Sequence, residues 1–123
     1  MLSHRPRPLL DVEQDGDVTL ARITVPVLDE TTAHRVATEL SRLVAGRARP
    51  RLWLDLSGIR RLTSAVLGQL LLLDWRLRAV QGEFVLVNLV DPVLDRLRLT
   101  RLLEVFNVQA AEEEGGRSTP LAS

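Results

Sequence analysis

The residues best placed to do chemistry in this sequence are two neighbouring hydroxyls, Thr63 and Ser64. They stand at the beginning of a long apolar segment that has the residue spacing of a helix. The first backbone N–H groups of a helix lack partners within it, and together with the helix dipole they favour oxygen acceptors and anions. We therefore expect one hydroxyl to cap the helix. A phosphate added here would leave the fold intact while it changes the charge of an exposed surface.

Other catalytic or metal-binding arrangements do not occur in the sequence. The two histidines, His4 and His34, are not spaced with carboxylates as metal ligands are, and Ser64 has no His or Lys near it in sequence to act as a base. There is no Cys, which excludes disulfides, thiolate zinc sites and cysteine nucleophiles. No glycine-rich phosphate loop follows an expected strand. We therefore expect a binding module, not an enzyme, with no metal and no cofactor.

Length and charge set the domain organisation. The chain has 123 residues, and sixteen basic residues balance sixteen acidic ones, so nucleic acid and anionic membranes are not expected partners. No apolar run has the length of a signal peptide or a membrane span, which favours a soluble, cytoplasmic protein. We expect a flexible N-terminal arm at residues 1–8, one domain at residues 9–108 and a disordered tail at residues 109–123.

The first part of the chain predicts a hairpin followed by a helix. Leu9–Glu13 and Val18–Val27 are typical of strands, and the Asp-Gly turn between them is one that joins hairpins. The apolar alternation slips at Ala21-Arg22, which suggests a bulge. Asp29 is the expected N-cap of an amphipathic helix that ends near Ala45-Gly46.

The second part alternates strand and helix. Leu52–Leu56 and Glu83–Val87 have the nearly continuous apolar character of inner strands that are covered on both faces. The long helix lies between them, Asp91 followed by Pro92 is expected to cap the next helix, and Leu103–Val108 is predicted to be a short edge strand. This order predicts an α/β fold, with a mixed, mostly parallel sheet of four to five strands and helices packed mainly on one face.

The long helix has two apolar sides. At 100° per residue, the side expected to face the sheet consists of Val66, Leu70, Leu73, Leu77 and Val80. The opposite side consists of Gly68, Leu71, Leu72, Trp75 and Ala79. Polar residues, Asp74 among them, occupy only the flanks. Either a neighbouring helix covers the second side, or it is a docking surface for another protein. In that case Trp75 would be its anchor, and a homodimer through Leu71, Leu72 and Trp75 would be one form of docking.

The motifs around this helix occur in an order that is known from one family. Asp55–Gly58 reads D-L-S-G, and Leu62–Gly68 falls without a gap on a second motif, D-S-S-G-L-G. Further matches downstream are Gly82, Phe84–Asn88, Leu97–Thr100 and Phe106. In these features, from about Leu9 to Val108, the sequence resembles the STAS domain, the family of bacterial anti-sigma factor antagonists.

The resemblance implies a non-enzymatic regulatory domain that binds an anti-sigma factor or serine kinase-like protein in partner-switching signalling. In that family the kinase phosphorylates the second serine of the motif and so ends the interaction. That serine aligns with Ala65 here, which leaves Ser64 and Thr63 as phosphorylation candidates, or else a constitutive scaffold that has lost the switch. The expected partner-binding residues are Leu62, Thr63, Ser64, Ala65, Gly68, Gln69, Leu72 and Trp75. Because cytoplasmic STAS proteins also dock on transporter ATPases, the alternative is an accessory subunit of an ABC transporter.

Overall fold

The structure is a computed structural model that describes residues 9–26 and 28–109. The expected arm at residues 1–8 lies outside the described residues, and so do residues 110–123 of the tail expected at residues 109–123. The last strand spans Asn107–Gln109, so it begins later than the edge strand predicted at Leu103–Val108 and includes the first residue of the expected tail. The elements in chain order are β1 (Leu10–Asp15), β2 (Val18–Ile23), α1 (Glu30–Val44), β3 (Arg51–Asp55), α2 (Ser64–Ala79), β4 (Glu83–Val87), α3 (Asp91–Leu99), the 3-10 turn η1 (Leu102–Glu104) and β5 (Asn107–Gln109).

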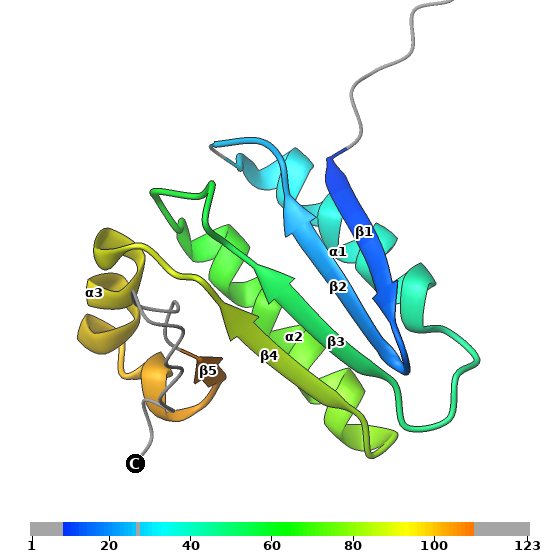
Figure 1. Cartoon of the computed structure of the whole chain (residues 1–123). Helices are drawn as coiled ribbons and strands as arrows, with labels where there is room; N and C mark the ends of the chain where they lie inside the picture. Colours follow the sequence, from blue (N-terminus) through cyan, green and yellow to red (C-terminus); the bar gives the residue numbers. More distant parts are fainter. Residues whose placement is uncertain (1–8, 27, 110–123) are drawn as a thin grey trace, which may run out of the picture.

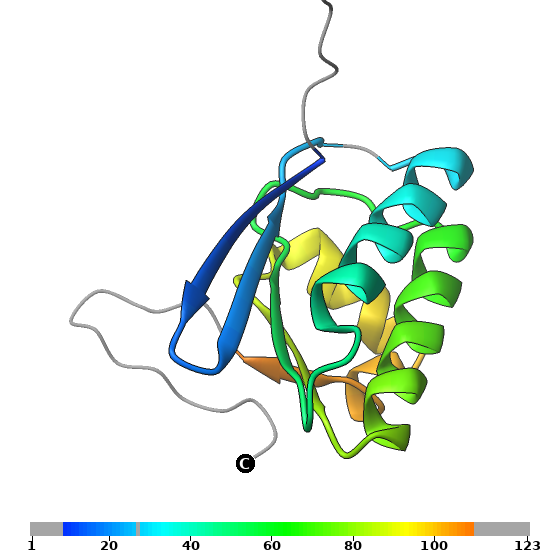
Figure 2. The ribbon, with the colours of Figure 1, turned by 90° about the vertical axis from the view of Figure 1, so that its right-hand side faces the viewer.

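The five strands form one mixed sheet in the order β1-β2-β3-β4-β5 (Figure 1). β1 pairs antiparallel with β2, and every other neighbouring pair is parallel. The helices α1 and α2 lie side by side against one face of the sheet, as the turned view makes clear (Figure 2). The predicted α/β fold, with a mostly parallel sheet and helices mainly on one face, is confirmed.

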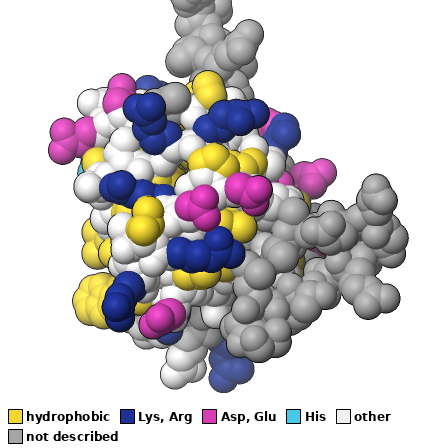
Figure 3. Space-filling model, turned by 90° about the vertical axis from the view of Figure 1, so that its left-hand side faces the viewer, with side chains coloured by type: hydrophobic (Ala, Val, Ile, Leu, Met, Phe, Trp, Pro, Cys, Tyr) yellow, Lys and Arg dark blue, Asp and Glu magenta, His cyan; other side chains and the backbone are white. Residues whose placement is uncertain are grey.

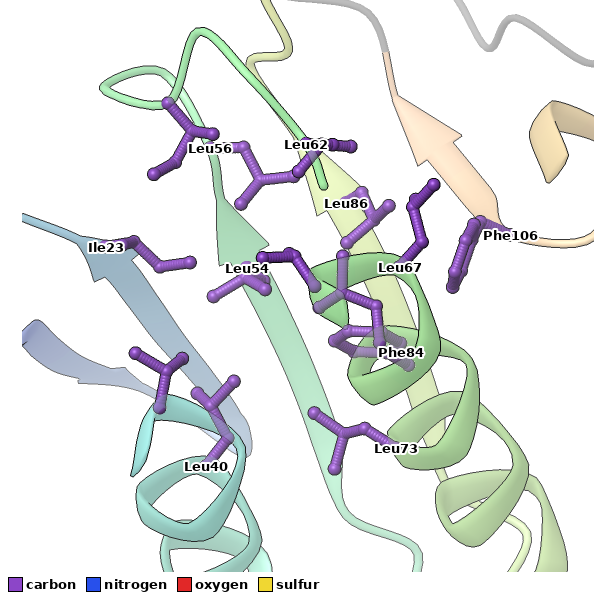
Figure 4. Close-up of a cluster of buried hydrophobic side chains, with 14 of the residues drawn as sticks. Ile23, Leu40, Leu54, Leu56, Leu62, Leu67, Leu73, Phe84, Leu86 and Phe106 are labelled. Carbon is purple, nitrogen blue, oxygen red and sulfur yellow. The ribbon is translucent and has the colours of Figure 1, made fainter. Parts of the chain in front are cut away.

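The core fills the space between this sheet face and the helices. Leu54, Phe84 and Leu86 extend from β3 and β4 towards Leu67 and other side chains of the helical layer (Figure 4). The rings of Phe84 and Phe106 meet edge to face, with their centroids 6.4 Å apart, and this contact ties the segment after η1 to the sheet. Aliphatic side chains supply almost all of the remaining core.

The hairpin differs from its prediction because no bulge interrupts it. Pairing between β1 and β2 is continuous from Leu10 opposite Ile23 to Asp15 opposite Val18. Ala21 is buried on the helical side, while Arg22 lies on the other face and donates to Asp11 over 2.7 Å. The apparent slip at Ala21-Arg22 therefore reflects a small buried residue beside an ion pair, and not an inserted residue. β2 also ends at Ile23, short of its predicted end.

The two central strands differ in how far they are covered. β4 is buried on both faces, as predicted, with Val85 and Val87 each 7% exposed. β3 is not. Its residues Arg51, Trp53 and Asp55 are only half-buried on the face away from the helices. The prediction of two covered faces is therefore wrong for β3.

The helix ends follow the capping rules with one exception. Asp29 caps α1, since its Oδ1 accepts from the backbone N–H of Thr32 over 2.8 Å, and Gly46 takes a left-handed φ of 77° just after that helix. Asp91, however, is the first residue of α3 and not its cap; Val90 holds that position without a side-chain bond. A carboxylate in the first turn still favours the helix through the dipole.

Candidate protein-docking site

The loop between β3 and α2 is fixed to the sheet by the side chain at the end of β3. Asp55 Oδ1 accepts from the backbone N–H of Ser57 over 2.8 Å, and Asp55 Oδ2 accepts from Asn88 Nδ2 over 3.0 Å. Gly58 then passes close to β2, where an added Cβ would lie 3.4 Å from the carbonyl oxygen of Ile23. The D-L-S-G motif therefore has a structural role, because it fixes the first part of the loop that leads to α2.

Three apolar side chains of the same loop are buried in the core: Leu56, Ile59 and Leu62. Leu62 is only 3% exposed and lies among the core residues in Figure 4. The structure thus places this predicted partner-binding residue beneath the surface. Its side chain anchors the start of α2 and is not available for contact.

The two hydroxyls at the helix start have different environments. Thr63 is the N-cap of α2, and its half-buried Oγ1 accepts from the backbone N–H of Val66 over 3.2 Å. This confirms that one of the two caps the helix. Ser64 is the first residue of α2, is exposed, and its hydroxyl makes no hydrogen bond with the described residues. Of the two candidates, Ser64 therefore has the free and accessible oxygen.

The side of α2 that faces away from the sheet is exposed along its whole length. We call this surface the α2 outer face, and it consists of Ser64, Gly68, Leu72, Trp75 and Ala79. Trp75 is 68% exposed and Leu72 40%, whereas Leu71, beside them, is half-buried against the core. α1 packs against one flank of α2, and no other described element covers the outer face, so the interpretation of a covering helix is wrong for this part of the chain.

Ala65 and Gln69, the remaining predicted contact residues, lie half-buried at the border of the outer face. Figure 3 views the molecule from the side of α3 and β5. Hydrophobic side chains gather there along the edge formed by the helical layer, next to basic ones. The structure thus brings every predicted contact residue except Leu62 and the capping hydroxyl of Thr63 to one accessible border of α2.

One polar residue beside this face was not expected to be buried. Asp74 is 5% exposed, and its Oδ2 accepts from Arg78 Nε over 2.9 Å. Arg78 also donates through Nη2 to the carbonyl oxygen of Val105 over 2.8 Å, which links α2 to the segment after η1. Burial raises the pKa of Asp74, and the charge of Arg78 opposes this shift. The i,i+4 spacing of Asp74 and Arg78 was the sequence signal for this pair.

Two negative findings apply to residues 9–26 and 28–109. No cluster of three His, Asp or Glu side chains in this part could hold a metal ion. No helix in it is both long enough and apolar enough to cross a membrane.

Comparison with known proteins identifies the class of protein that this fold and site define. Residues 10–115 match the STAS domain model, so the chain belongs to the STAS domain family. The resemblance found in the sequence motifs is confirmed.

Solved structures agree with this assignment. The chain is similar to an anti-sigma-factor antagonist (STAS) domain protein from Planctomyces limnophilus, with 20% identity, a TM-score of 0.75, and coverage of 86% of this chain and 92% of that one. It is also similar to an anti-sigma factor antagonist from Mycobacterium paratuberculosis, with 25% identity, a TM-score of 0.68, and coverage of 80% and 82%.

Proposed function

We propose that this chain is a non-enzymatic regulatory domain that binds a protein partner of the anti-sigma factor or serine-kinase type through the α2 outer face. It would act in signal transduction that controls transcription. The anti-sigma factor antagonist names of its structural relatives support the class of partner. The main support for the proposal is the exposure of Trp75, whose residue surface is 68% exposed on a helix whose other side forms the core.

The chemistry of the outer face suits a protein partner. Trp75 and Leu72 offer apolar area to a partner, and Trp is enriched among the residues that dominate binding energy at interfaces. Gly68 lies one helical turn before Leu72 on the same face, and an added Cβ there would meet nothing within 4 Å. A glycine in the middle of a helix lowers its stability, and here it leaves a flat area where a partner backbone can approach closely.

The switch, in this proposal, is Ser64 rather than Thr63. Phosphorylation of Thr63 would alter the cap of α2, because the oxygen that accepts from the N–H of Val66 would become a phosphate ester oxygen. Phosphorylation of Ser64 would leave that bond in place, and the unpaired N–H groups of the first turn would accommodate the new charge. About two negative charges would then lie at the end of the outer face and would change its complementarity to a partner.

The test is isothermal titration calorimetry of the full chain with purified anti-sigma kinases and transporter ATPases encoded by the same genome. We expect a kinase to bind, and Trp75→Glu to weaken binding at least about tenfold while the circular dichroism spectrum is unchanged. Leu99→Glu is the matched control, because Leu99 is 83% exposed but lies on α3. Equal binding by Trp75→Glu and the unmodified chain would contradict the docking site, and binding to a transporter ATPase alone would replace the proposed partner.

The switch has its own test. The bound kinase is incubated with ATP and the chain, and the modified residue is mapped by mass spectrometry, with Ser64→Ala and Thr63→Ser as matched variants. We expect modification at Ser64, which Ser64→Ala abolishes and Thr63→Ser does not. Modification at Thr63 or elsewhere would overturn the assignment.

A further inference from the structure

A pocket unrelated to the outer face lies at the other end of α2. The C-terminal ends of α1 and α2 and the loop before β3 enclose a volume of about 210 Å³. Its floor consists of the apolar side chains Val44, Leu73 and Leu77, all of them buried. Val80 extends this apolar surface to the rim, where it remains 54% exposed.

Two arginines line the pocket, and no carboxylate from the described part of the chain does. Arg76 is exposed and makes no ion pair or hydrogen bond with the described residues. Among the described residues, the Arg47 side chain donates only to a neutral group, the hydroxyl of Thr19, over 3.1 Å. Neither guanidinium group has a carboxylate partner among the described residues, so an anion bound on the apolar floor would accept charge-assisted hydrogen bonds from them.

The walls of the pocket are held in place by the backbone. Gly82 lies so close to Pro50 that an added Cβ would be 2.5 Å from the Pro50 carbonyl oxygen, and that oxygen accepts from the N–H of Glu83 over 2.8 Å. At the other end of the loop, Gly46 takes a left-handed conformation with φ 77° that a side chain would disfavour. The loop that carries Arg47 is therefore held at its Pro50 end, which reduces the cost of ordering this wall of the pocket on binding.

We propose that this pocket binds a small amphiphilic anion, with an apolar chain on the floor and a single carboxylate or phosphate head between Arg47 and Arg76. The volume of about 210 Å³ is below the range of about 300–1,000 Å³ that is typical of pockets for drug-sized ligands, so the ligand is small. This site goes beyond the proposed docking function and does not depend on it, because none of the outer-face residues lines the pocket.

The test uses three probes with the same chain and different heads: octanoate, octyl phosphate and neutral 1-octanol. Binding to the full chain is measured by the shift of the melting temperature with probe concentration and by titration of backbone amide signals in NMR spectra. We expect saturable binding of at least one anionic probe, with the amide changes centred on residues 44–47 and 76–80. The anion that binds more tightly identifies the head group.

Arg76→Gln should weaken that binding about tenfold, because it removes a charge-assisted hydrogen bond from an exposed position without disturbing the fold. Arg60→Gln, which removes another unpaired arginine outside the pocket, should leave binding unchanged. Ser41→Trp, which fills the pocket, should abolish binding if its spectrum remains folded. Equal binding of 1-octanol and the anions, no saturable binding of either anion, or full binding by Arg76→Gln would each overturn the proposal.

Discussion

The two sides of α2 carry similar residues in opposite environments. Leu72 and Leu73 are neighbours in the chain, yet Leu73 is 3% exposed in the core and Leu72 is 40% exposed on the outer face. Composition therefore cannot tell the two sides apart. The difference comes from the neighbouring elements, because α1 and β4 cover one side of α2 and no described element covers the other. One side stabilises the fold, and the other is free for a partner.

The largest effect is expected when a leucine on each side of α2 is truncated to alanine. Leu73→Ala should lower the free energy of unfolding by about 2–5 kcal/mol, because it removes buried methyl groups and leaves a cavity. Leu72→Ala should lower it by about 0.5 kcal/mol or less, as is usual for exposed positions. Urea denaturation of both variants measures the contrast. Similar losses would mean that Leu72 is packed in solution and that the outer face is not free.

Two glycines sharpen the comparison. Gly82→Ala should destabilise the chain by about 1–3 kcal/mol, since the new Cβ would lie 2.5 Å from the backbone oxygen of Pro50. Gly68→Ala should do the reverse and stabilise the chain by about 0.5–1 kcal/mol, because the outer face has room for the methyl group and Ala is the better helix former.

Thermal unfolding of the two glycine variants shows whether each substitution raises or lowers the stability. Calorimetry with the partner then measures how Gly68→Ala changes the binding affinity. A more stable variant that binds more weakly is the expected outcome. Unchanged binding would show that a close approach at Gly68 is not required.

The features of the fold that could be predicted from the sequence are mainly those that depend on residues close together in the chain. Caps depend on a few neighbouring residues, so the cap at Asp29, the glycine at Gly46 and a hydroxyl cap at the start of α2 were predicted correctly. One local prediction was wrong, because Val90 and not Asp91 is the N-cap of α3. The other errors arose where residues distant in the sequence determine the structure. Arg22 pairs across the hairpin with Asp11, and this pairing accounts for an alternation that had suggested a bulge.

For the candidate site, the sequence predicted which residues share a surface but not which of them are exposed. Helical spacing identified Trp75 and Leu72 as one surface, but it could not show that α1 leaves that surface uncovered. Val80 was assigned to the inward stripe, yet it follows the last helical residue and lies 54% exposed at the rim of the pocket. The burial of Asp74 depends on tertiary packing, since its partner Arg78 is held by Val105, 27 residues further along the chain.

A smaller change in stability is expected when the two hydroxyls at the start of α2 are removed. Thr63→Ala should cost about 1 kcal/mol of stability, the usual value for loss of an N-cap, whereas Ser64→Ala should be close to neutral. Thr63→Ser is the control, because a serine hydroxyl can accept the same bond from the N–H of Val66. Chemical denaturation distinguishes these variants. A larger loss for Ser64→Ala than for Thr63→Ala would show that the cap is Ser64, and the proposed switch would then lose its free hydroxyl.

The smallest expected effect concerns Asp74, on the border between the two sides of α2. Burial raises its pKa in the folded chain above the usual value, and Arg78 only partly offsets this. The folded state therefore binds the proton more tightly than the unfolded state does. The resulting stabilisation is complete below the unfolded pKa of about 3.9 and is lost as the pH rises through the raised folded value.

Asp74→Asn removes this titration and keeps an oxygen that can accept from Arg78 Nε. The stability of the unmodified chain relative to Asp74→Asn should therefore increase as the pH falls from about 7 to about 4, measured by urea denaturation at each pH. Asp95→Asn is the control for loss of a helix ion pair, because Asp95 and Arg98 form an exposed pair on α3 that is worth at most about 1 kcal/mol. A difference between the unmodified chain and Asp74→Asn that does not change with pH would show that water reaches Asp74. The bond from Arg78 to Val105 would then not seal the border of the outer face.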